Sequence, residues 1–218
     1  MSPRRRTAIL ISGRGSNMTA LIGAERALDF PAEIALVLTN KSSAGGLALA
    51  RQAGVAAAVV DHKIYAGRDE FEGSMQAMLD IHRIDLICLA GFMRILTAPF
   101  VSRWRGAILN IHPSLLPSFP GLNTHARAIE AGVKIHGCTA HFVEPELDAG
   151  PIIAQAAVAV RDSDTPDTLA SRVLAEEHAI YPAALACVAE GRQRLEGNRV
   201  FCGDPATEPP PLRVPFAE

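Results

Sequence analysis

The chain has 218 residues, and its hydrophobic content of 49% is enough for one well-packed domain. Its formal net charge of −2 gives no broad positive field for nucleic acid, and we interpret the arginines at residues 4–6 as a solvated start. No apolar stretch reaches the roughly 18 residues of a membrane span, and the run after these arginines is broken at Ser12 and Gly13, so we expect neither a membrane anchor nor a secretory signal.

The first half of the chain alternates short apolar runs with stretches of helical periodicity. Strands are predicted at residues 7–11, 34–39, 55–60, 85–90 and 107–111, and helices at residues 18–28, 45–53 and 68–82. Strands that are apolar on both faces and alternate with helices indicate a mostly parallel sheet covered on both sides. We therefore predict a doubly wound α/β fold.

The second half changes to longer β segments at residues 135–143 and 152–160, joined by an acidic loop, which indicates an antiparallel or mixed edge. A last helix is predicted at residues 166–190. Pro166 suits its first turn, Asp164 or Thr165 its cap, and Gly191 its end. We assign residues 1–201 to one domain and the proline-rich residues 202–218 to a tail that we expect to be extended or disordered.

Four cysteines, Cys88, Cys138, Cys187 and Cys202, are scattered along the chain without a Cys-x-x-Cys spacing. This pattern suits reduced packing residues in the cytosol better than a disulfide or zinc framework. We therefore expect a cytoplasmic protein with reduced cysteines.

A glycine-rich turn at residues 12–17 joins the first strand to the first helix. Its backbone N–H groups, the Ser16 hydroxyl and the Asn17 amide would gather at a positive helix end, which suits a phosphate. Alternatively, Gly13 and Gly15 supply only a tight turn and Ser16 only a helix cap. A dinucleotide fingerprint would need a glycine at position 18, where Met18 stands, so NAD is disfavoured.

Asn110 and His112 lie two residues apart at the end of a predicted strand and therefore point to the same side. Asp148, in the acidic loop, can fix the tautomer and charge of His112. Asn110 can donate a hydrogen bond to a developing oxyanion while His112 moves a proton. Because this group includes no nucleophilic serine or cysteine, we expect acyl transfer to an amine of a substrate. The alternative for a lone His112 is a satisfied histidine at a strand end.

A catalytic metal is not expected. The other histidines show no zinc-type pairing with a third ligand, and His136 and His141 are five residues apart in a predicted strand, which directs them to opposite faces.

Five segments, in order and spacing from about residue 7 to residue 201, resemble the phosphoribosylglycinamide formyltransferase family. They are Ile-Ser-Gly-Arg-Gly-Ser-Asn (11–17), Ala-Gly-Phe-Met-Arg-Ile-Leu (90–96), Asn-Ile-His-Pro-Ser-Leu-Leu-Pro (110–117), Phe-Pro-Gly-Leu-Asn-Thr-His (119–125) and Glu-Leu-Asp-Ala-Gly-Pro-Ile (146–152). The resemblance implies transfer of a formyl group from 10-formyltetrahydrofolate, as co-substrate, to the amino group of glycinamide ribonucleotide in de novo purine biosynthesis.

The resemblance also implies roles for single residues. Those implied for catalysis are Asn110, His112 and Asp148. Those implied for the ribonucleotide are Gly15, Ser16, Asn17, Met18, Thr19 and Glu177. Those implied for the folate are Arg68, Met93, Arg94, Ile95, Leu96, Asn110, Val143, Glu144 and Asp148.

The chemistry of these side chains agrees with the implied folate site. A pterin needs an apolar slot, which Met93, Ile95, Leu96 and Val143 could build, and Arg68 could face the glutamate carboxylate of the folate. Taken singly, each has another interpretation, as a core residue or as a surface charge. The role of Arg14 in the glycine turn stays open between a phosphate contact and solvent.

Other formyl-folate enzymes share the Asn-x-His and Asp core, so this core indicates the reaction but not the acceptor. Formyltetrahydrofolate deformylase usually carries an additional N-terminal domain and methionyl-tRNA formyltransferase an additional C-terminal RNA-binding domain, and we expect neither here. A non-catalytic nucleotide-binding module is the alternative of another class. We expect small-molecule substrates, no nucleic-acid or membrane partner, and a monomer or homodimer.

Overall fold

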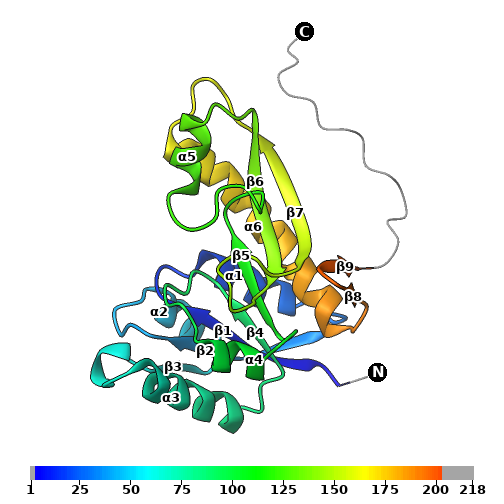
Figure 1. Ribbon diagram of the computed structural model, residues 1–218. Helices are drawn as coiled ribbons and strands as arrows, with labels where there is room; N and C mark the ends of the chain where they lie inside the picture. Colours follow the sequence, from blue (N-terminus) through cyan, green and yellow to red (C-terminus); the bar gives the residue numbers. More distant parts are fainter. Residues whose placement is uncertain (1–2, 203–218) are drawn as a thin grey trace.

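The computed structural model describes residues 3–202, so residues 203–218 of the expected tail lie outside the described part (Figure 1). Within that part, nine strands form one sheet in the order β3-β2-β1-β4-β5-β6-β7-β9-β8. The strands are β1 Arg5–Ile11, β2 Ala32–Thr39, β3 Ala57–Val59, β4 Leu86–Leu89, β5 Ile108–His112, β6 Ile135–Phe142, β7 Ile152–Ala159, β8 Arg194–Glu196 and β9 Arg199–Phe201. The helices are α1 Ser16–Glu25, α2 Gly46–Gln52, α3 Arg68–Ile81, α4 Ala98–Arg103, α5 Thr124–Glu130 and α6 Pro166–Ala189, with a 3-10 turn, η1, at His62–Ile64.

The sheet changes character at β5. Strands β1 to β5 pair in parallel, whereas β6 runs antiparallel to both β5 and β7. The carboxyl ends of β1, β4 and β5 therefore lie at one edge of the sheet, where ligands of doubly wound folds bind. The predicted fold class, a mostly parallel sheet with an antiparallel C-terminal edge, is confirmed.

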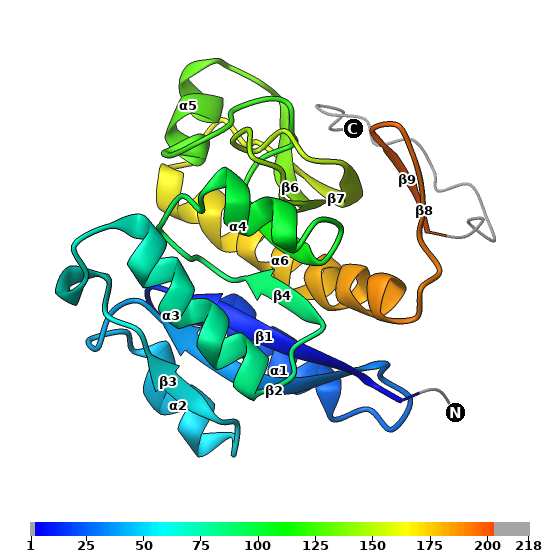
Figure 2. The same cartoon turned by 60° about the horizontal axis from the view of Figure 1, so that its bottom comes forward.

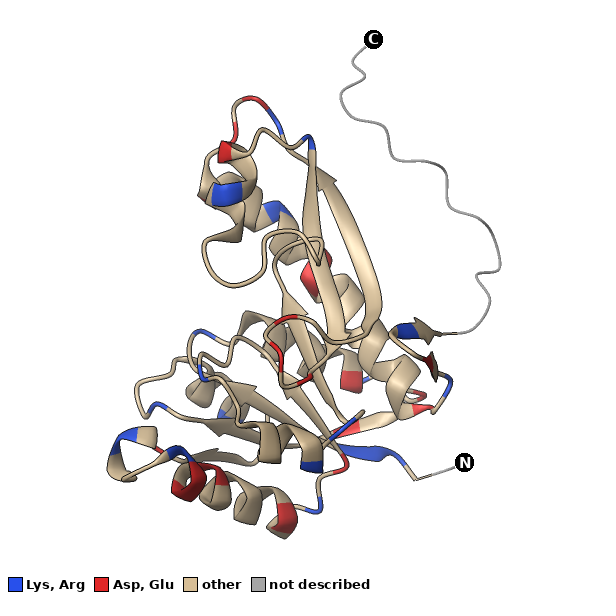
Figure 3. Ribbon diagram, viewed as in Figure 1, with Lys and Arg blue, Asp and Glu red and all other residues tan. Residues whose placement is uncertain are grey.

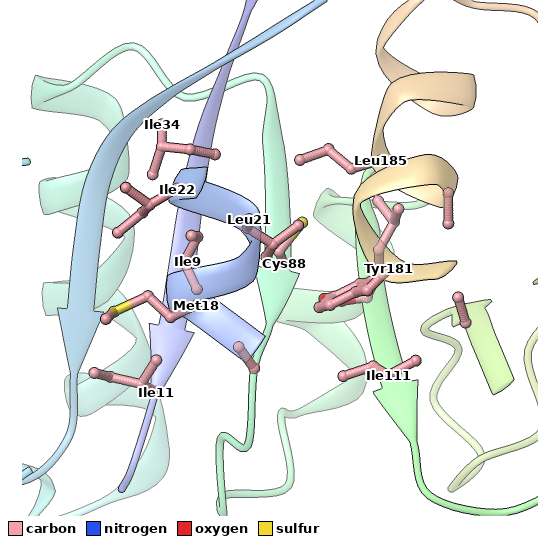
Figure 4. Packing of buried hydrophobic residues seen from close by; sticks show 14 of the residues in the cluster. Ile9, Ile11, Met18, Leu21, Ile22, Ile34, Cys88, Ile111, Tyr181 and Leu185 are labelled. Carbon is pink, nitrogen blue, oxygen red and sulfur yellow. The ribbon is translucent and has the colours of Figure 1, made fainter. Parts of the chain in front are cut away.

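Helices cover both faces of the sheet, as Figure 2 shows with α3 and α4 in front of the strands and α1, α2 and α6 behind them. The alternation along β1 explains both layers, because Ile9 and Ile11 pack with α1 and α6 while Ala8 and Leu10 pack with α3 and α4. Figure 4 shows the first of these two clusters. In it the Tyr181 ring is fully buried, and its hydroxyl lies 3.0 Å and 3.1 Å from the carbonyl oxygens of Leu89 and Leu109, so α6 contacts the last residue of β4 and the second residue of β5.

The predicted last helix is confirmed in detail. Thr165 is its N-cap, accepting a hydrogen bond from the backbone N–H of Thr168, whose side chain in turn contacts the backbone N–H of Thr165. Pro166 occupies the first turn, where its missing N–H costs nothing, and Gly191 follows the helix with a positive φ of 68°.

Helix α1 begins at Ser16 and its N-cap is Gly15, so the alternative in which Ser16 only caps the helix does not hold. The expectation of reduced cysteines is wrong for two of the four. Cys187 and Cys202 form a disulfide, with Cα atoms 6.1 Å apart, whereas Cys88 and Cys138 are free and buried. The hairpin of β8 and β9 returns Cys202 to the end of α6, and such an approach of two distant cysteines leaves no local spacing pattern in the sequence.

None of the helices within residues 3–202 combines the length and the apolar character that crossing a membrane requires.

Candidate active site

Strand β5 presents Asn110 and His112 on one face and buries Leu109 and Ile111 on the other. Leu109 and Ile111 belong to the cluster that packs on α1 and α6, so the period of two along the strand directs both polar side chains away from that core. The structure therefore confirms that Asn110 and His112 share a face.

His112 lies between two oxygen atoms. Its Nδ1 is 3.6 Å from Oδ2 of Asp148, and its Nε2 is 3.1 Å from the carbonyl oxygen of Phe119. Both side chains of the His112–Asp148 pair are almost buried, at 7% and 9% exposure, so water screens their interaction little. The structure thus brings together the histidine and the carboxylate that the sequence places 36 positions apart.

The loop between β6 and β7 holds Asp148 in an unusual backbone conformation, with a φ of 53°. Its Oδ2 accepts a hydrogen bond of 2.8 Å from the backbone N–H of Gly121. Two residues later, a Cβ added to Gly150 would lie 1.9 Å from the carbonyl oxygen of Phe142, so the chain can close here only with glycine. This acidic loop is visible in the middle of Figure 3.

His141 also belongs to the site, although the sequence indicated no role for this residue beyond excluding it as a metal ligand. It stands opposite Asn110 in β6, and its Nε2 lies 3.1 Å from Nδ2 of Asn110. Its Nδ1 lies 2.7 Å from the carbonyl oxygen of Phe142, which can only accept, so Nδ1 carries the hydrogen and Nε2 accepts from the amide. Burial lowers the pKa of His141, which keeps the ring neutral and able to accept.

His141 thereby fixes the orientation of the Asn110 amide. One N–H of the amide is used by His141, and the other can donate to a ligand. The position opposite Asn110 in an antiparallel partner strand is the sequence signal that would have found His141, once the register between the two strands was known.

The glycine turn is built for close approach of backbone to a ligand. Gly15 has a φ of 82°, and a Cβ there would lie 3.0 Å from Cα of Gly46. No side chain caps the N-terminus of α1, so its first backbone N–H groups are open to an anion. The side chain of Met18 is buried in the core and that of Thr19 bonds the carbonyl of Gly15, so these two residues can offer a ligand mainly their backbone.

Glu177 reaches this turn from α6. Its Oε2 accepts a hydrogen bond of 2.6 Å from Nδ2 of Asn17, and its side chain is 7% exposed. Burial raises the pKa of Glu177, although the bond from Asn17 opposes the shift. Among the described residues, Oδ1 of Asn17 is buried without a hydrogen-bond partner, which leaves an acceptor beside the turn.

The residues expected to contact folate do not all share one environment. Leu96 is buried and Val143 packs against the same core, whereas Met93 and Ile95 are 63% and 61% exposed. Arg68 is the exposed first residue of α3, Arg94 is half-buried, and Glu144 lies 3.8 Å from Arg105. Of the four residues expected to build the apolar slot, two thus belong to the core and two are exposed.

Within residues 3–202, no group of three or more histidine, cysteine or acidic side chains could hold a metal ion. A hollow of about 260 Å³ at the ends of β2 and β3 is lined by Lys41, Ser42, Ser43, Asp61 and Lys63, none of which is an expected site residue.

Comparisons with known proteins place these observations in a family. The profile of the formyl transferase family matches residues 5–185. The chain is 50% identical over 199 residues to the human trifunctional purine biosynthetic protein adenosine-3. The aligned region covers 91% of this chain but only 20% of the human protein. It is 44% identical over 193 residues to the phosphoribosylglycinamide formyltransferase of Escherichia coli, covering 88% and 91% of the two chains.

Comparison with solved structures indicates the same family as the two sequence comparisons. Glycinamide ribonucleotide transformylase 1 from Symbiobacterium toebii superimposes with a TM-score of 0.89 at 46% identity, covering 92% of this chain and 94% of the other. The chain therefore spans about a fifth of the trifunctional relative and nearly all of the Escherichia coli and Symbiobacterium toebii relatives.

Proposed function

The chain belongs to the formyl transferase family, and from this premise we propose that it transfers the formyl group of 10-formyltetrahydrofolate to the amino group of glycinamide ribonucleotide. The products are formylglycinamide ribonucleotide and tetrahydrofolate. The reaction is a step of purine biosynthesis, and we place it in the cytoplasm. Only the free, buried Cys88 and Cys138 agree with the reduced cysteines on which that expectation rested, whereas the Cys187–Cys202 disulfide does not.

The proposed chemistry needs three residues. The amine of the ribonucleotide attacks the formyl carbon, and the N–H of Asn110 that His141 leaves free stabilises the oxyanion. His112, paired with Asp148, accepts the proton that the attacking amine loses and passes a proton to the tetrahydrofolate nitrogen as its bond to the formyl carbon breaks. Each proton therefore has a donor and an acceptor, and no covalent enzyme intermediate is required.

The two substrates are assigned to opposite sides of this group. The ribonucleotide phosphate binds the uncapped N-terminus of α1 at residues 15–19, and Glu177 binds another part of the same substrate. The folate binds along residues 93–96 and residues 143–148, with Arg68 at its glutamate end.

The observation that supports this proposal best is the convergence of Asn110, His112 and Asp148 on the edge of the sheet that also carries the glycine turn. A binding module has no use for a buried His–Asp pair beside a free amide donor. We therefore prefer the transferase to the nucleotide-binding alternative.

A two-substrate assay tests the function. Purified protein with 10-formyltetrahydrofolate should release tetrahydrofolate only when glycinamide ribonucleotide is added, and a chelator should not change the rate. Release without the ribonucleotide would indicate a deformylase, and formyl transfer from formate plus ATP in place of the folate would indicate another donor. His112→Ala should keep the fold and lose the turnover, whereas unchanged turnover would contradict the proposed mechanism.

A further inference from the structure

The segment at residues 91–97, between β4 and α4, has neither helix nor strand, yet it carries four of the proposed folate contacts. Phe92 and Leu96 pack into the core, but the exposed side chains of Met93 and Ile95 contribute little packing to hold the rest of the segment in place. A segment of this kind needs other anchors to keep its backbone in one position, because each fixed residue costs about 1–2 kcal/mol of conformational entropy.

The first anchor is Ser12, at the end of β1. Its backbone N–H donates to the carbonyl of Gly91 at 3.1 Å, and its Oγ accepts from the backbone N–H of Met93 at 2.8 Å. The hydroxyl then donates to Oδ1 of Asn40 at 2.6 Å, so its direction is fixed. Ser12 and Asn40 are 6% and 1% exposed, and no solvent competes for these bonds.

The second anchor is Glu72, on α3. Its Oε1 accepts from the backbone N–H of Thr97 at 2.8 Å, and its Oε2 accepts from the hydroxyl of the same residue. Thr97 is also the N-cap of α4, and its side-chain hydroxyl oxygen accepts a hydrogen bond from the backbone N–H of Phe100. Glu72 is only 6% exposed, and a carboxylate buried to this degree is costly unless its acceptors are used.

We propose that Ser12 and Glu72 are positioning residues for the folate donor, which clamp the two ends of the segment at residues 91–97. The inference rests on the proposed function, because it assumes that this segment binds the folate. Neither side chain is proposed to touch the substrate. Each acts through the backbone that it holds, and its loss should weaken the folate site. Because Glu72 lies on α3, outside the glycine turn, its loss should also leave the ribonucleotide site intact.

The structure offers a matched control for Glu72. Gln76 lies one turn later on α3 and also links this helix to the region of α4, because its Oε1 accepts from Nε1 of Trp104 at 2.7 Å. Gln76→Ala therefore removes a contact of the same kind without touching residues 91–97. A purely structural role would make Glu72→Ala and Gln76→Ala behave alike.

The test measures four quantities for each variant: the KM for 10-formyltetrahydrofolate, the Kd for tetrahydrofolate, the Kd for glycinamide ribonucleotide, and the Tm. Glu72→Ala and Ser12→Ala should each raise the folate KM and Kd roughly tenfold, as expected for a lost buried hydrogen bond. For Glu72→Ala, whose side chain lies on α3 away from the glycine turn, the ribonucleotide Kd should change less than about twofold. Glu72→Gln keeps an acceptor for Thr97 and should recover most of the folate affinity. Gln76→Ala should lower the Tm with an unchanged folate KM.

Equal folate constants for Glu72→Ala and Gln76→Ala at a similar fall in Tm would overturn the inference. If Glu72→Ala does not fold, Ser12→Ala decides, and an unchanged tetrahydrofolate Kd in that variant would overturn it as well. A parent protein that binds no tetrahydrofolate would instead refute the proposed function, so the two failures are distinct.

Discussion

Oδ2 of Asp148 lies 3.6 Å from Nδ1 of His112 and accepts, through the same atom, a 2.8 Å hydrogen bond from the backbone N–H of Gly121. The carboxylate is thus held by one loop and directed at the histidine of another segment. Because its position does not depend on His112 alone, a neutral side chain of the same shape can occupy the same place.

Asp148→Asn should therefore separate charge from shape. The amide oxygen can still accept from Gly121, but the negative charge beside His112 is gone, so we expect kcat to fall by about 10² or more, within the range of acid–base effects. The Kd values of both substrates should change less than about threefold. Steady-state kinetics and calorimetric binding measure this, and an unaltered kcat from pH 6 to 9 would contradict the role of Asp148.

The glycine turn provides a pair of neighbouring substitutions with opposite expectations. Gly15→Ala forces a left-handed residue and a Cβ 3.0 Å from Gly46, so it should cost at least about 1–2 kcal/mol in the free energy of unfolding and raise the KM for the ribonucleotide. Gly13→Ala has no atom within 4 Å of its Cβ and no positive φ, so it should be nearly neutral for stability. Urea unfolding of both variants measures the contrast, which equal losses would refute.

His136 should make the protein less stable in acid. Burial, followed by the charge of His125, lowers the pKa of His136 from 6.5 to about 4 in the folded protein. Between these two values the unfolded chain binds the proton and the folded one does not, so the free energy of unfolding falls as the pH decreases from about 6.5 to about 4, by at most about 1.4 kcal/mol per pH unit. His136→Gln cannot titrate, and denaturant unfolding at several pH values should show a shallower slope. An identical slope would exclude this contribution of His136.

The disulfide makes a prediction that labelling can check. Unfolded, unreduced protein should expose two thiols, Cys88 and Cys138, and reduction should raise the number to four. The bond joins residues 15 positions apart, so reduction should also lower the free energy of unfolding by about 3 kcal/mol. Cys202→Ser is the matched variant, whose stability should not respond to reductant. Four thiols before reduction would show that the bond does not form.

The periodic spacing of apolar residues was enough to predict the longer elements of the fold. The core strands and the long helix α6, with its Thr165 cap and Pro166, were predictable because apolar spacing and capping residues are local signals. Helices α4 and α5, of six and seven residues, and the three-residue strands β8 and β9 were missed. Elements as short as α2 and β3 were found only because they continue the alternation of strands and helices in the first half.

How much of the site could be predicted from the sequence was limited by contacts between distant strands and loops. Asn110 and His112 share a face by simple alternation, which the sequence states directly. Their partners depend on register and loop closure, so Asp148 could be proposed as a partner of His112 but its position could not be derived, and His141 was assigned no role. The same reason hides the anchors Ser12 and Glu72, whose contacts join segments 81 and 25 positions apart.

The alternation along β5 also sets which changes of sequence the site can survive. Deleting or inserting one residue in this strand would exchange its two faces, so that Ile111 would stand where the amide and imidazole belong and the polar groups would enter the layer under α6. Length variation in this part of the chain should therefore be forbidden even where single replacements are accepted, and a scan of one-residue deletions should find β5 intolerant throughout.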